Sequence, residues 1–567
     1  MSSPVEVLPA ETVPLDPHAR RRAPLGRRPS SPLVTAALLV AAAAALPTAY
    51  LLIRSGTGGL AVFADTLVSA KTAGLLLRTT MLCAAVTATA IAISVPLAWL
   101  TVRTDLPGRR TWVVVSALPL VIPSFVGGYA FVAALGPRGI VQGWLEPLGV
   151  DRLPSIYGFG GAWLVLSLFT YPLVLLPVRA ALRGLDPALD EAARSLGHSP
   201  VSRLFRVTLP QLRPAIVSGG LLVALYTLSD FGAVSLLRFD SFTRAIYVAY
   251  RSSFDRSVAA ILGLVLVALA ALVFLAEART RGRVMYHSAH RGAHRSTRTV
   301  RLGRWRWPFF AACSVLVAIA LVVPIAVILL WLGRGIAAGV PFGFAFGAAA
   351  RSVEASLLGA VAGVACAWPV AYLGARYPGR LGRLVEGASY MGYALPGIVV
   401  ALALVFFAAR YVPFVYQSLG LLTFAYVVHF LPQATGALRA SIAQVHPGLE
   451  EAARSLGAPP REVLRRITLP LVRPGALTAF ALLFLTVMKE LPATLLLAPT
   501  EFSTLATEVW DAASAASFAQ AAAPALTLIL LSSLPMALLV RREGSVRQRP
   551  AESYEKPTAL PAHLFES

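Results

Sequence analysis

Charged residues are scarce in this sequence. Asp, Glu, Lys and Arg make up only 14% of the 567 residues, whereas about 25% is usual in soluble globular proteins. The mean hydropathy is correspondingly high, at +0.70. This composition excludes an ordinary soluble protein, because most of the chain has to contact lipid or other apolar helices.

Cysteine is almost absent as well. Cys83, Cys313 and Cys366 all fall inside long apolar runs and provide neither a disulfide framework nor a zinc-binding spacing. The sequence contains no P-loop pattern G-x-x-x-x-G-K-[ST], and no Ser/His/Asp, Cys/His or paired-carboxylate arrangement that indicates an enzyme. We therefore expect no catalytic residues, no metal site and no cofactor bound by this chain.

Long apolar runs are the most prominent feature of the sequence. Stretches of about 20 mostly apolar residues are long enough to cross a bilayer as helices. They predict an all-α integral membrane protein with about twelve transmembrane helices, the first being an uncleaved helix and not a signal peptide. The expected helices span residues 33–53, 73–102, 112–135, 158–182, 215–237, 257–276, 307–333, 353–375, 385–409, 417–438, 475–498 and 520–540.

Basic residues are unevenly distributed around these helices. The net charge is +23, of which about +21 lies on the side of the membrane that holds both termini, about +3 on the other side and about −1 within the helices. Because Arg and Lys in short loops mark the cytoplasmic side, we expect both termini in the cytoplasm and the chain in a bacterial cytoplasmic (inner) membrane. The charge indicates topology and not nucleic-acid binding, since no basic domain with interleaved aromatic residues accompanies it.

The chain is built from two similar halves. Arg78, Pro96 and Pro123 each have an identical residue 273 positions later. Pro172 matches Pro432 at an offset of 260, which predicts a longer external loop before the fourth helix of the first half. Six helices per half give the copies parallel topology, with the expected pathway at their interface. The expected domains are a disordered cytoplasmic N-terminus (1–32), a first transmembrane domain (33–276), a basic cytoplasmic linker (277–306), a second transmembrane domain (307–541) and a cytoplasmic tail (542–567).

One polar loop on the expected cytoplasmic side occurs twice. Residues 187–214 read PALDEAARSLGHSPVSRLFRVTLPQLRP, and residues 447–474 read PGLEEAARSLGAPPREVLRRITLPLVRP. Roughly 17 of the 28 positions are identical in an alignment without gaps. A single such loop is equally well explained as a surface helix that packs only on its own bundle. Two near-identical loops at equivalent places favour two docking points for a partner.

Each copy predicts a short amphipathic helix. Pro187 and Pro447 occupy the first helical position, followed by acidic residues that the helix dipole favours. Gly197 and Gly457 predict left-handed C-caps. A second short helix is expected to begin after each glycine. The Leu-Pro pairs at 209–210 and 469–470 are expected to end it.

This pattern resembles the coupling loop of binding-protein-dependent ABC importer permeases, and the resemblance covers residues 33–541 of the chain. It implies that each loop is a coupling helix that inserts into a cytoplasmic ABC ATPase, so that two copies of the ATPase bind one chain. ATP and magnesium would then bind to that partner, and a periplasmic or lipid-anchored solute-binding protein would deliver the substrate. The matching residues are Glu191, Ala192, Ala193, Gly197, Leu209 and Pro210, and Glu451, Ala452, Ala453, Gly457, Leu469 and Pro470.

The fused layout is most similar to the ferric-iron permease subfamily. Residues 228–234 and 487–495 carry this likeness, and residues 502–510 continue it. Ferric iron is therefore the expected substrate, while thiamine, phosphonate and polyamine importers remain as alternatives. An ion-coupled secondary transporter, which also uses two six-helix halves, remains as an alternative of another class.

Two acidic residues interrupt apolar helices at equivalent positions. Asp230 and Glu490 are separated by the same offset of 260 residues. Ionisable groups at membrane depth usually face the bundle interior or a wet cavity, so both residues are candidates for the translocation route. The structural alternative is that they form hydrogen bonds inside broken helices, helped by Gly232 and Pro492.

Three histidines lie in the basic linker. His287, His290 and His294 would share one face of a helix. Neighbouring arginines disfavour a bound cation, and Gly282 and Gly292 disfavour a helix. We therefore expect a solvated linker without a metal site.

Overall fold

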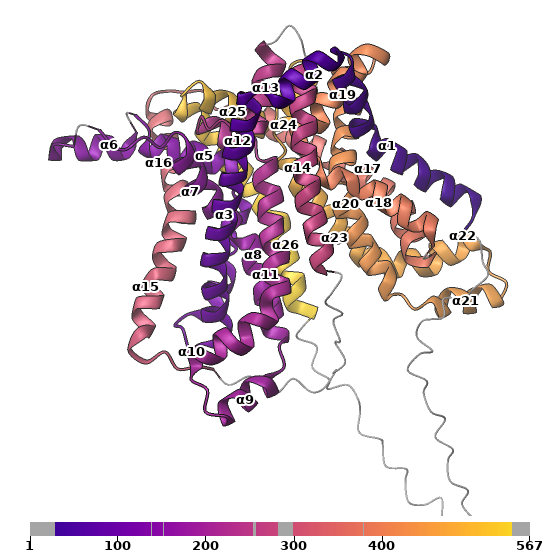
Figure 1. Cartoon of the computed structure of the whole chain (residues 1–567), viewed down its shortest axis with the longest axis horizontal. Helices are drawn as coiled ribbons and strands as arrows, with labels where there is room; N and C mark the ends of the chain where they lie inside the picture. The colour runs from indigo at the N-terminus through magenta and orange to yellow at the C-terminus, as the bar shows by residue number, and fades with distance from the viewer. Residues whose placement is uncertain are drawn as a thin grey trace, which may run out of the picture.

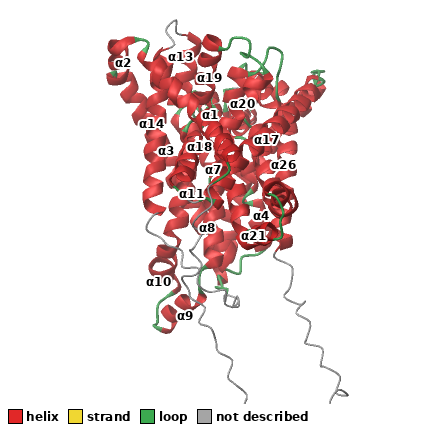
Figure 2. Cartoon of the chain, turned by 90° about the vertical axis from the view of Figure 1, so that its right-hand side faces the viewer, coloured by secondary structure: helices red, strands yellow, loops and turns green. Residues whose placement is uncertain are grey.

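The computed structural model describes residues 29–252, 257–281 and 299–546, except for 138, 151 and 378. In these residues the regular elements are helices, apart from one bridge pair between Thr104 and Val300 (Figures 1 and 2). The predicted all-α fold is therefore confirmed. The linker histidines lie outside the described residues.

The first half follows the order that the sequence predicts. Its fourth predicted span is a run of two helices, and a two-helix insertion precedes that span. The elements are α1 (Ser31–Gly56), α2 (Gly59–Val68), α3 (Ala70–Arg103), α4 (Arg109–Val115), η2 (Leu118–Val121), α5 (Ser124–Leu135), α6 (Ile140–Leu145), η3 (Glu146–Leu148), α7 (Phe159–Thr170), α8 (Pro172–Gly184), α9 (Pro187–Ser195), α10 (Pro200–Arg203), η4 (Leu204–Thr208), α11 (Leu209–Ser229), α12 (Gly232–Leu236), α13 (Phe242–Ser252) and α14 (Ser257–Arg281).

The second half repeats this order with shorter connections. The elements are η5 (Gly303–Trp305), α15 (Arg306–Val317), η6 (Ala318–Val322), α16 (Val323–Ala337), α17 (Phe344–Arg376), α18 (Arg380–Ala394), α19 (Gly397–Tyr411), α20 (Leu419–Gln444), α21 (Pro447–Ser455), α22 (Pro460–Val463), η7 (Leu464–Thr468), α23 (Leu469–Met488), α24 (Pro492–Leu497), α25 (Leu505–Ser514) and α26 (Phe518–Val546). The longer loop predicted in the first half is present and contains α6 and η3, which project from the left edge of the molecule in Figure 1.

Ten helices or helix runs among the described residues are long and apolar enough to cross a membrane. Several of the predicted spans contain more than one helix, and 112–135 and 385–409 are two of them. Both break before a proline, since Ile122 and Leu395 have extended backbone with ψ of 119° and 118°. Proline removes a backbone donor and disfavours helical geometry in the preceding residue, so a helix cannot run through these sites undisturbed.

Each half is built around three mutually packed helices. In the first half these are α3, α8 and α11, and in the second half they are α17, α20 and α23. The first helix of each half also packs on the other half. Helix α1 contacts α17 and α18 as well as α14, while α16 contacts α5 as well as α26. This exchange joins the two halves into one bundle (Figure 1).

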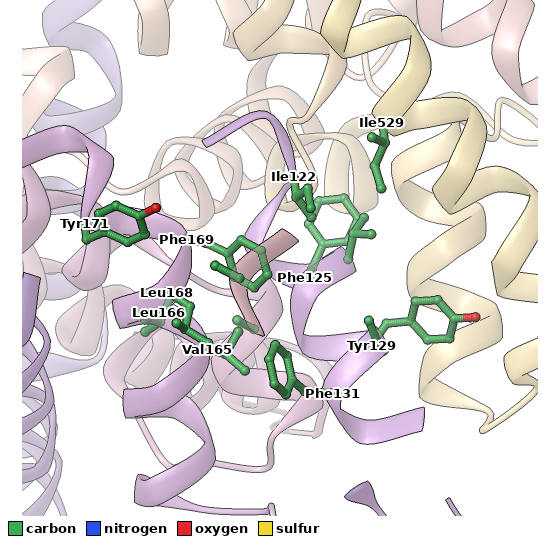
Figure 3. Packing of buried hydrophobic residues seen from close by; sticks show 14 of the residues in the cluster. Ile122, Phe125, Tyr129, Phe131, Val165, Leu166, Leu168, Phe169, Tyr171 and Ile529 are labelled. Carbon is green, nitrogen blue, oxygen red and sulfur yellow. The ribbon is translucent and has the colours of Figure 1, made fainter. Parts of the chain in front are cut away.

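The helices that follow the two breaks lie in the interior. In α5, every residue from Ser124 to Ala134 is buried. Figure 3 shows its aromatic side chains packed toward α7 on one side and α26 on the other. The Tyr129 hydroxyl donates to the backbone carbonyl of Phe518 at 2.7 Å, which ties α5 of the first half to the second half. In α19, residues 397–406 are buried in the same way.

The end of the linker is held on the first half. The Val300 amide donates to the Arg103 carbonyl at 2.8 Å, and the Val300 carbonyl accepts from the Asp105 amide at 3.2 Å. The Asp105 carboxylate then accepts from the Leu302 amide at 2.8 Å. The segment that leads into the second half is therefore hydrogen-bonded to the end of α3 and the residues that follow it.

Candidate functional site

The two repeated loops form matching helices at one end of the molecule. Figure 1 shows α9 and α10 at the lower left, and α21 and α22 at the right, with α21 below α22. The predicted starts are confirmed. The Asp186 carboxylate accepts from the Ala188 amide at 2.9 Å, and the His446 Nδ1 accepts from the Gly448 amide at 3.1 Å. Both side chains thereby satisfy an amide that the helix leaves without a partner.

Both helices end at a left-handed glycine, as predicted. Gly197 has φ of +83° and Gly457 has φ of +85°. The next residue closes the cap, since the His198 amide donates to the Ala193 carbonyl at 3.1 Å and the second copy repeats this bond. A Cβ at either glycine would meet no atom within 4 Å. Glycine is therefore needed for backbone conformation and not for space.

The prediction that the Leu-Pro pairs end the second short helix is wrong. The chain stays helical from α10 through η4 into α11, and from α22 through η7 into α23. The segments η4 and η7 are π-helical and directly precede Leu209-Pro210 and Leu469-Pro470. A π turn is wider than an α turn, so it can accommodate a proline that has no N–H and crowds the preceding carbonyl.

Each coupling-loop helix leaves leucine side chains without cover in the described chain. The exposed fractions of Leu189 and Leu196 are 52% and 79%, and those of Leu449 and Leu456 are 50% and 89%. The motif residues Glu191, Ala192, Glu451 and Ala452 are also exposed, whereas Ala193 is buried and Ala453 is half-buried. Each helix therefore packs on its own half with one side and presents an apolar and acidic surface with the other.

A buried glutamate anchors the second coupling-loop helix to α17. The Glu450 side chain is 4% exposed and pairs with Arg376, whose Nη2 lies 3.0 Å from Oε1. Thr468 and Tyr372 donate to the same carboxylate at 3.0 Å and 3.3 Å, and Arg454 completes the cluster at 3.3 Å. The charge is thus both paired and hydrogen-bonded, which a buried carboxylate requires.

Sequence reasoning missed Glu450 because the motif match selects its exposed neighbour Glu451. A signal was nevertheless present. Arg376 and Arg103 end the equivalent helices α17 and α3 at the common offset of 273, and an acidic residue stands at 190 as well as at 450. A buried partner for that arginine could have been proposed from this pairing.

Asp230 caps a short helix at the break after α11. Its carboxylate accepts from the amides of Ala233 at 3.0 Å and Val234 at 3.3 Å, and from the Ser124 hydroxyl. The side chain is 7% exposed. Asp230 thus joins the start of α12 to the start of α5, two interior helix ends whose dipoles favour a negative charge.

Glu490 occupies the corresponding place in the second half. Its carboxylate accepts from the Ala493 amide at 3.1 Å and caps α24. A Cβ on Gly397, at the start of α19, would lie 2.8 Å from Glu490 Oε1 and 3.4 Å from His429 Nε2. The glutamate and the histidine therefore converge on the glycine that opens α19.

The two halves meet at these breaks. The Lys489 ammonium donates to the Leu120 carbonyl of the first half at 3.2 Å. A Cβ on Gly232 would lie 2.5 Å from Phe125 Cβ and 3.1 Å from a methyl group of Leu491, so only glycine allows this approach. The sequence paired Asp230 with Glu490, but it contained no signal for the contact between Lys489 and Leu120.

The three cysteines do not form a site. Cys83 and Cys313 are buried and Cys366 is half-buried, and all three are free thiols. Over the described ranges, no group of three or more His, Cys, Asp and Glu side chains is arranged to hold a metal ion. The site therefore consists of the two coupling-loop helices and the paired breaks between the halves.

Known proteins are similar to this chain in sequence. The family model described as "Binding-protein-dependent transport system inner membrane component" matches the chain twice, over residues 90–284 and 355–548. The Fe(3+)-transport system permease protein FbpB 2 of Haemophilus influenzae is 36% identical over 518 residues, which cover 90% of this chain and 98% of that protein.

Two other relatives match over shorter ranges. The ferric transport system permease protein FbpB of Actinobacillus pleuropneumoniae is 24% identical over 67% of this chain and 58% of its own length. The molybdenum transport system permease protein ModB of Escherichia coli is 35% identical over 24% of this chain and 58% of its own length. Since the family model covers both halves, each with its own coupling loop and break, the chain belongs to the binding-protein-dependent transport system inner membrane components, as a fused two-domain permease.

Proposed function

We propose that this chain is the membrane subunit of an ATP-driven importer, and that two ABC ATPase subunits dock on its two coupling-loop helices. The observation that supports this most strongly is the exposure of four leucines at equivalent places, one within and one directly after each of α9 and α21. Burial of a leucine stabilises a complex by roughly 1.5–3 kcal/mol. A secondary transporter has no need for a paired surface of this kind, and the family match does not favour it.

The absence of a P-loop and the distribution of charge indicate which functions belong to partner proteins. ATP and magnesium bind to the partner ATPase, because the chain has no P-loop. The coupling-loop end faces the cytoplasm, together with both termini, in agreement with the basic excess on that side. A periplasmic or lipid-anchored solute-binding protein then delivers the substrate to the opposite end.

Ferric iron is the proposed substrate. The support is the relative from Haemophilus influenzae, a Fe(3+)-transport permease that matches 90% of this chain. The molybdenum relatives match only about a quarter of it. The breaks at Asp230 and Glu490 are the proposed part of the route, because they lie where the halves meet and carry ionisable groups at membrane depth.

Uptake of radiolabelled ferric iron in cells with and without this gene tests the assignment. Thiamine, a phosphonate, a polyamine and molybdate serve as parallel substrates. We expect iron uptake alone to fall without the gene and to return with the wild-type gene. A fall in another substrate at normal iron uptake would overturn the iron assignment and leave the importer in place.

A further inference from the structure

One aromatic side chain lies between the two halves at the break. Phe231 follows Asp230 directly and is 1% exposed. Its ring centroid lies 4.9 Å from that of Tyr247 in α13 and 4.9 Å from that of Trp510 in α25. Tyr247 and Trp510 are themselves 6.4 Å apart. The first half thus contributes two rings to this cluster and the second half contributes one.

Two of the three rings occupy comparable places in the internal repeat. Tyr247 is the sixth residue of α13 and Trp510 is the sixth residue of α25, so these rings occupy comparable places in the two halves. Phe231 lies between them. The equivalent of Phe231 in the second half is Leu491, which packs against Gly232 and is 2% exposed. Phe231 therefore packs against two comparably placed aromatic residues, one from each half.

Partly exposed side chains lie on the coupling-loop side of this cluster. Tyr226, one helical turn before the break, is 37% exposed. Leu222, one further turn toward the coupling loop on the same face of α11, is also partly exposed. The equivalent residues Thr486 and Leu482 of α23 are partly exposed too. The side chains one and two turns before each break are therefore partly exposed, whereas Phe231 is buried.

We propose that Phe231, Tyr247 and Trp510 form the gate that closes the route at the end away from the coupling loops. Opening consists of the separation of Phe231 and Tyr247, both of the first half, from Trp510 of the second half when the halves move apart at this end. This proposal rests on the proposed transport function but not on iron as the substrate. In Figure 1, α13 and α25 lie at the upper end of the molecule, opposite α9 and α21.

The position of Phe231 also explains how the gate can respond to the rest of the bundle. Its neighbour Asp230 is tied to α5 through Ser124 and to α12 through two amides. The carbonyl of Asp230 accepts from the Thr243 hydroxyl of α13 at 2.7 Å. A shift of α11 relative to α5 therefore moves Phe231 and the start of α13 together.

Thiol labelling tests the gate without any substrate. A Tyr226→Cys reporter is placed in the full chain after replacement of Cys83, Cys313 and Cys366 by alanine. A membrane-impermeant maleimide is added without ATP, either to inside-out vesicles, which expose the coupling loops, or to right-side-out vesicles, which expose the opposite end. We expect labelling in inside-out vesicles to be at least tenfold faster than in right-side-out vesicles.

Removal of the proposed gate should abolish this difference. Phe231→Ala is expected to raise labelling in right-side-out vesicles at least tenfold, and Trp510→Ala should do the same from the other half. Phe231→Leu, which introduces the residue found at 491, should have a smaller effect. The control is Phe159→Ala, since Phe159 pairs with Phe239 at 6.0 Å and is 42% exposed. It should leave labelling unchanged.

The outcomes are distinct. Rapid outer labelling of the Tyr226→Cys reporter with an intact Phe231 would overturn the proposal. Slow outer labelling in both Phe231→Ala and Trp510→Ala, with normal inner labelling as proof of assembly, would also overturn it. Because neither ATP nor iron is present, failure of the gate proposal is distinguishable from failure of the proposed function.

Discussion

At the residue scale, the carboxylates of the two breaks are matched to the residues that face them. Asp230 is one methylene shorter than Glu490 and accepts from the Ser124 hydroxyl. Glu490 faces Gly397, where a Cβ would come within 2.8 Å of its oxygen. The shorter Asp230 faces the larger Ser124, and the longer Glu490 faces the smaller Gly397, so the two pairs fill similar spaces. Both carboxylates also cap a short helix, so the structural interpretation of these residues and their proposed place on the route are compatible.

Glu490→Gln tests the proposed role on the route. Glutamine retains an oxygen that can accept from the Ala493 amide, so we expect normal assembly. Loss of the charge is expected to reduce uptake severalfold. The measurement is substrate uptake at matched amounts of protein in the membrane. Glu354→Gln is the control, because Glu354 is an exposed acid on the outer surface of α17. Unchanged uptake by assembled Glu490→Gln would remove Glu490 from the route.

Glu450→Gln tests the anchor of the second coupling-loop helix. The substitution leaves the buried Arg376 guanidinium without its anionic partner. Breaking a buried pair in this way costs about 3 kcal/mol or more. We expect a lower apparent melting temperature in detergent and faster proteolysis of the loop. Glu451→Gln changes the adjacent, exposed side chain and should alter the free energy of unfolding by less than about 0.5 kcal/mol. Equal effects of the two substitutions would contradict the anchoring role.

At the element scale, prolines shape both halves in two ways. Before Pro123 and Pro396 the helix breaks and an interior helix begins. Before Pro210 and Pro470 the helix continues through a π-helical segment. Hydropathy and proline position do not distinguish these cases, because the local sequence does not show whether neighbouring helices leave room for a wider turn.

The glycine caps give a prediction for the coupling-loop helices. Gly457→Ala places an alanine at φ of +85° without any steric contact, so its cost is conformational and amounts to roughly 1 kcal/mol. We expect faster hydrogen exchange in the last turn of α21 and about fivefold weaker binding of the ATPase. Gly457→Asn should weaken ATPase binding less than Gly457→Ala, because asparagine tolerates the left-handed conformation better than alanine. An alanine variant with unchanged exchange would show that the cap does not order the loop.

At the scale of the whole molecule, the pattern of long helices and the duplicated loops could be predicted from the sequence, because apolar length and sequence identity are local properties. The contacts that join the halves could not. Helix α1 of the first half packs on α17 and α18 of the second half. Lys489 reaches a carbonyl 369 residues away. Such pairings depend on which helix faces which, and hydropathy does not encode this.

The fusion of two halves gives one chain two coupling loops, which should each hold one ATPase. The first loop exposes Phe205 at 61%, where the second has an arginine, so the two docking surfaces are similar but not identical. The exchange of first helices makes it difficult for one half to move without the other. We therefore expect both docking points to be needed for transport.

The measurement that tests this central claim most directly is the number of ATPase copies bound per chain, determined by native mass spectrometry of the purified complex. The account predicts two copies for the wild type, one for Leu196→Glu or Leu456→Glu alone, and none for the double variant. Leu148→Glu, which alters an exposed leucine outside the coupling loops, should retain two. Two bound copies in the double variant, or a single copy in the wild type, would contradict the account.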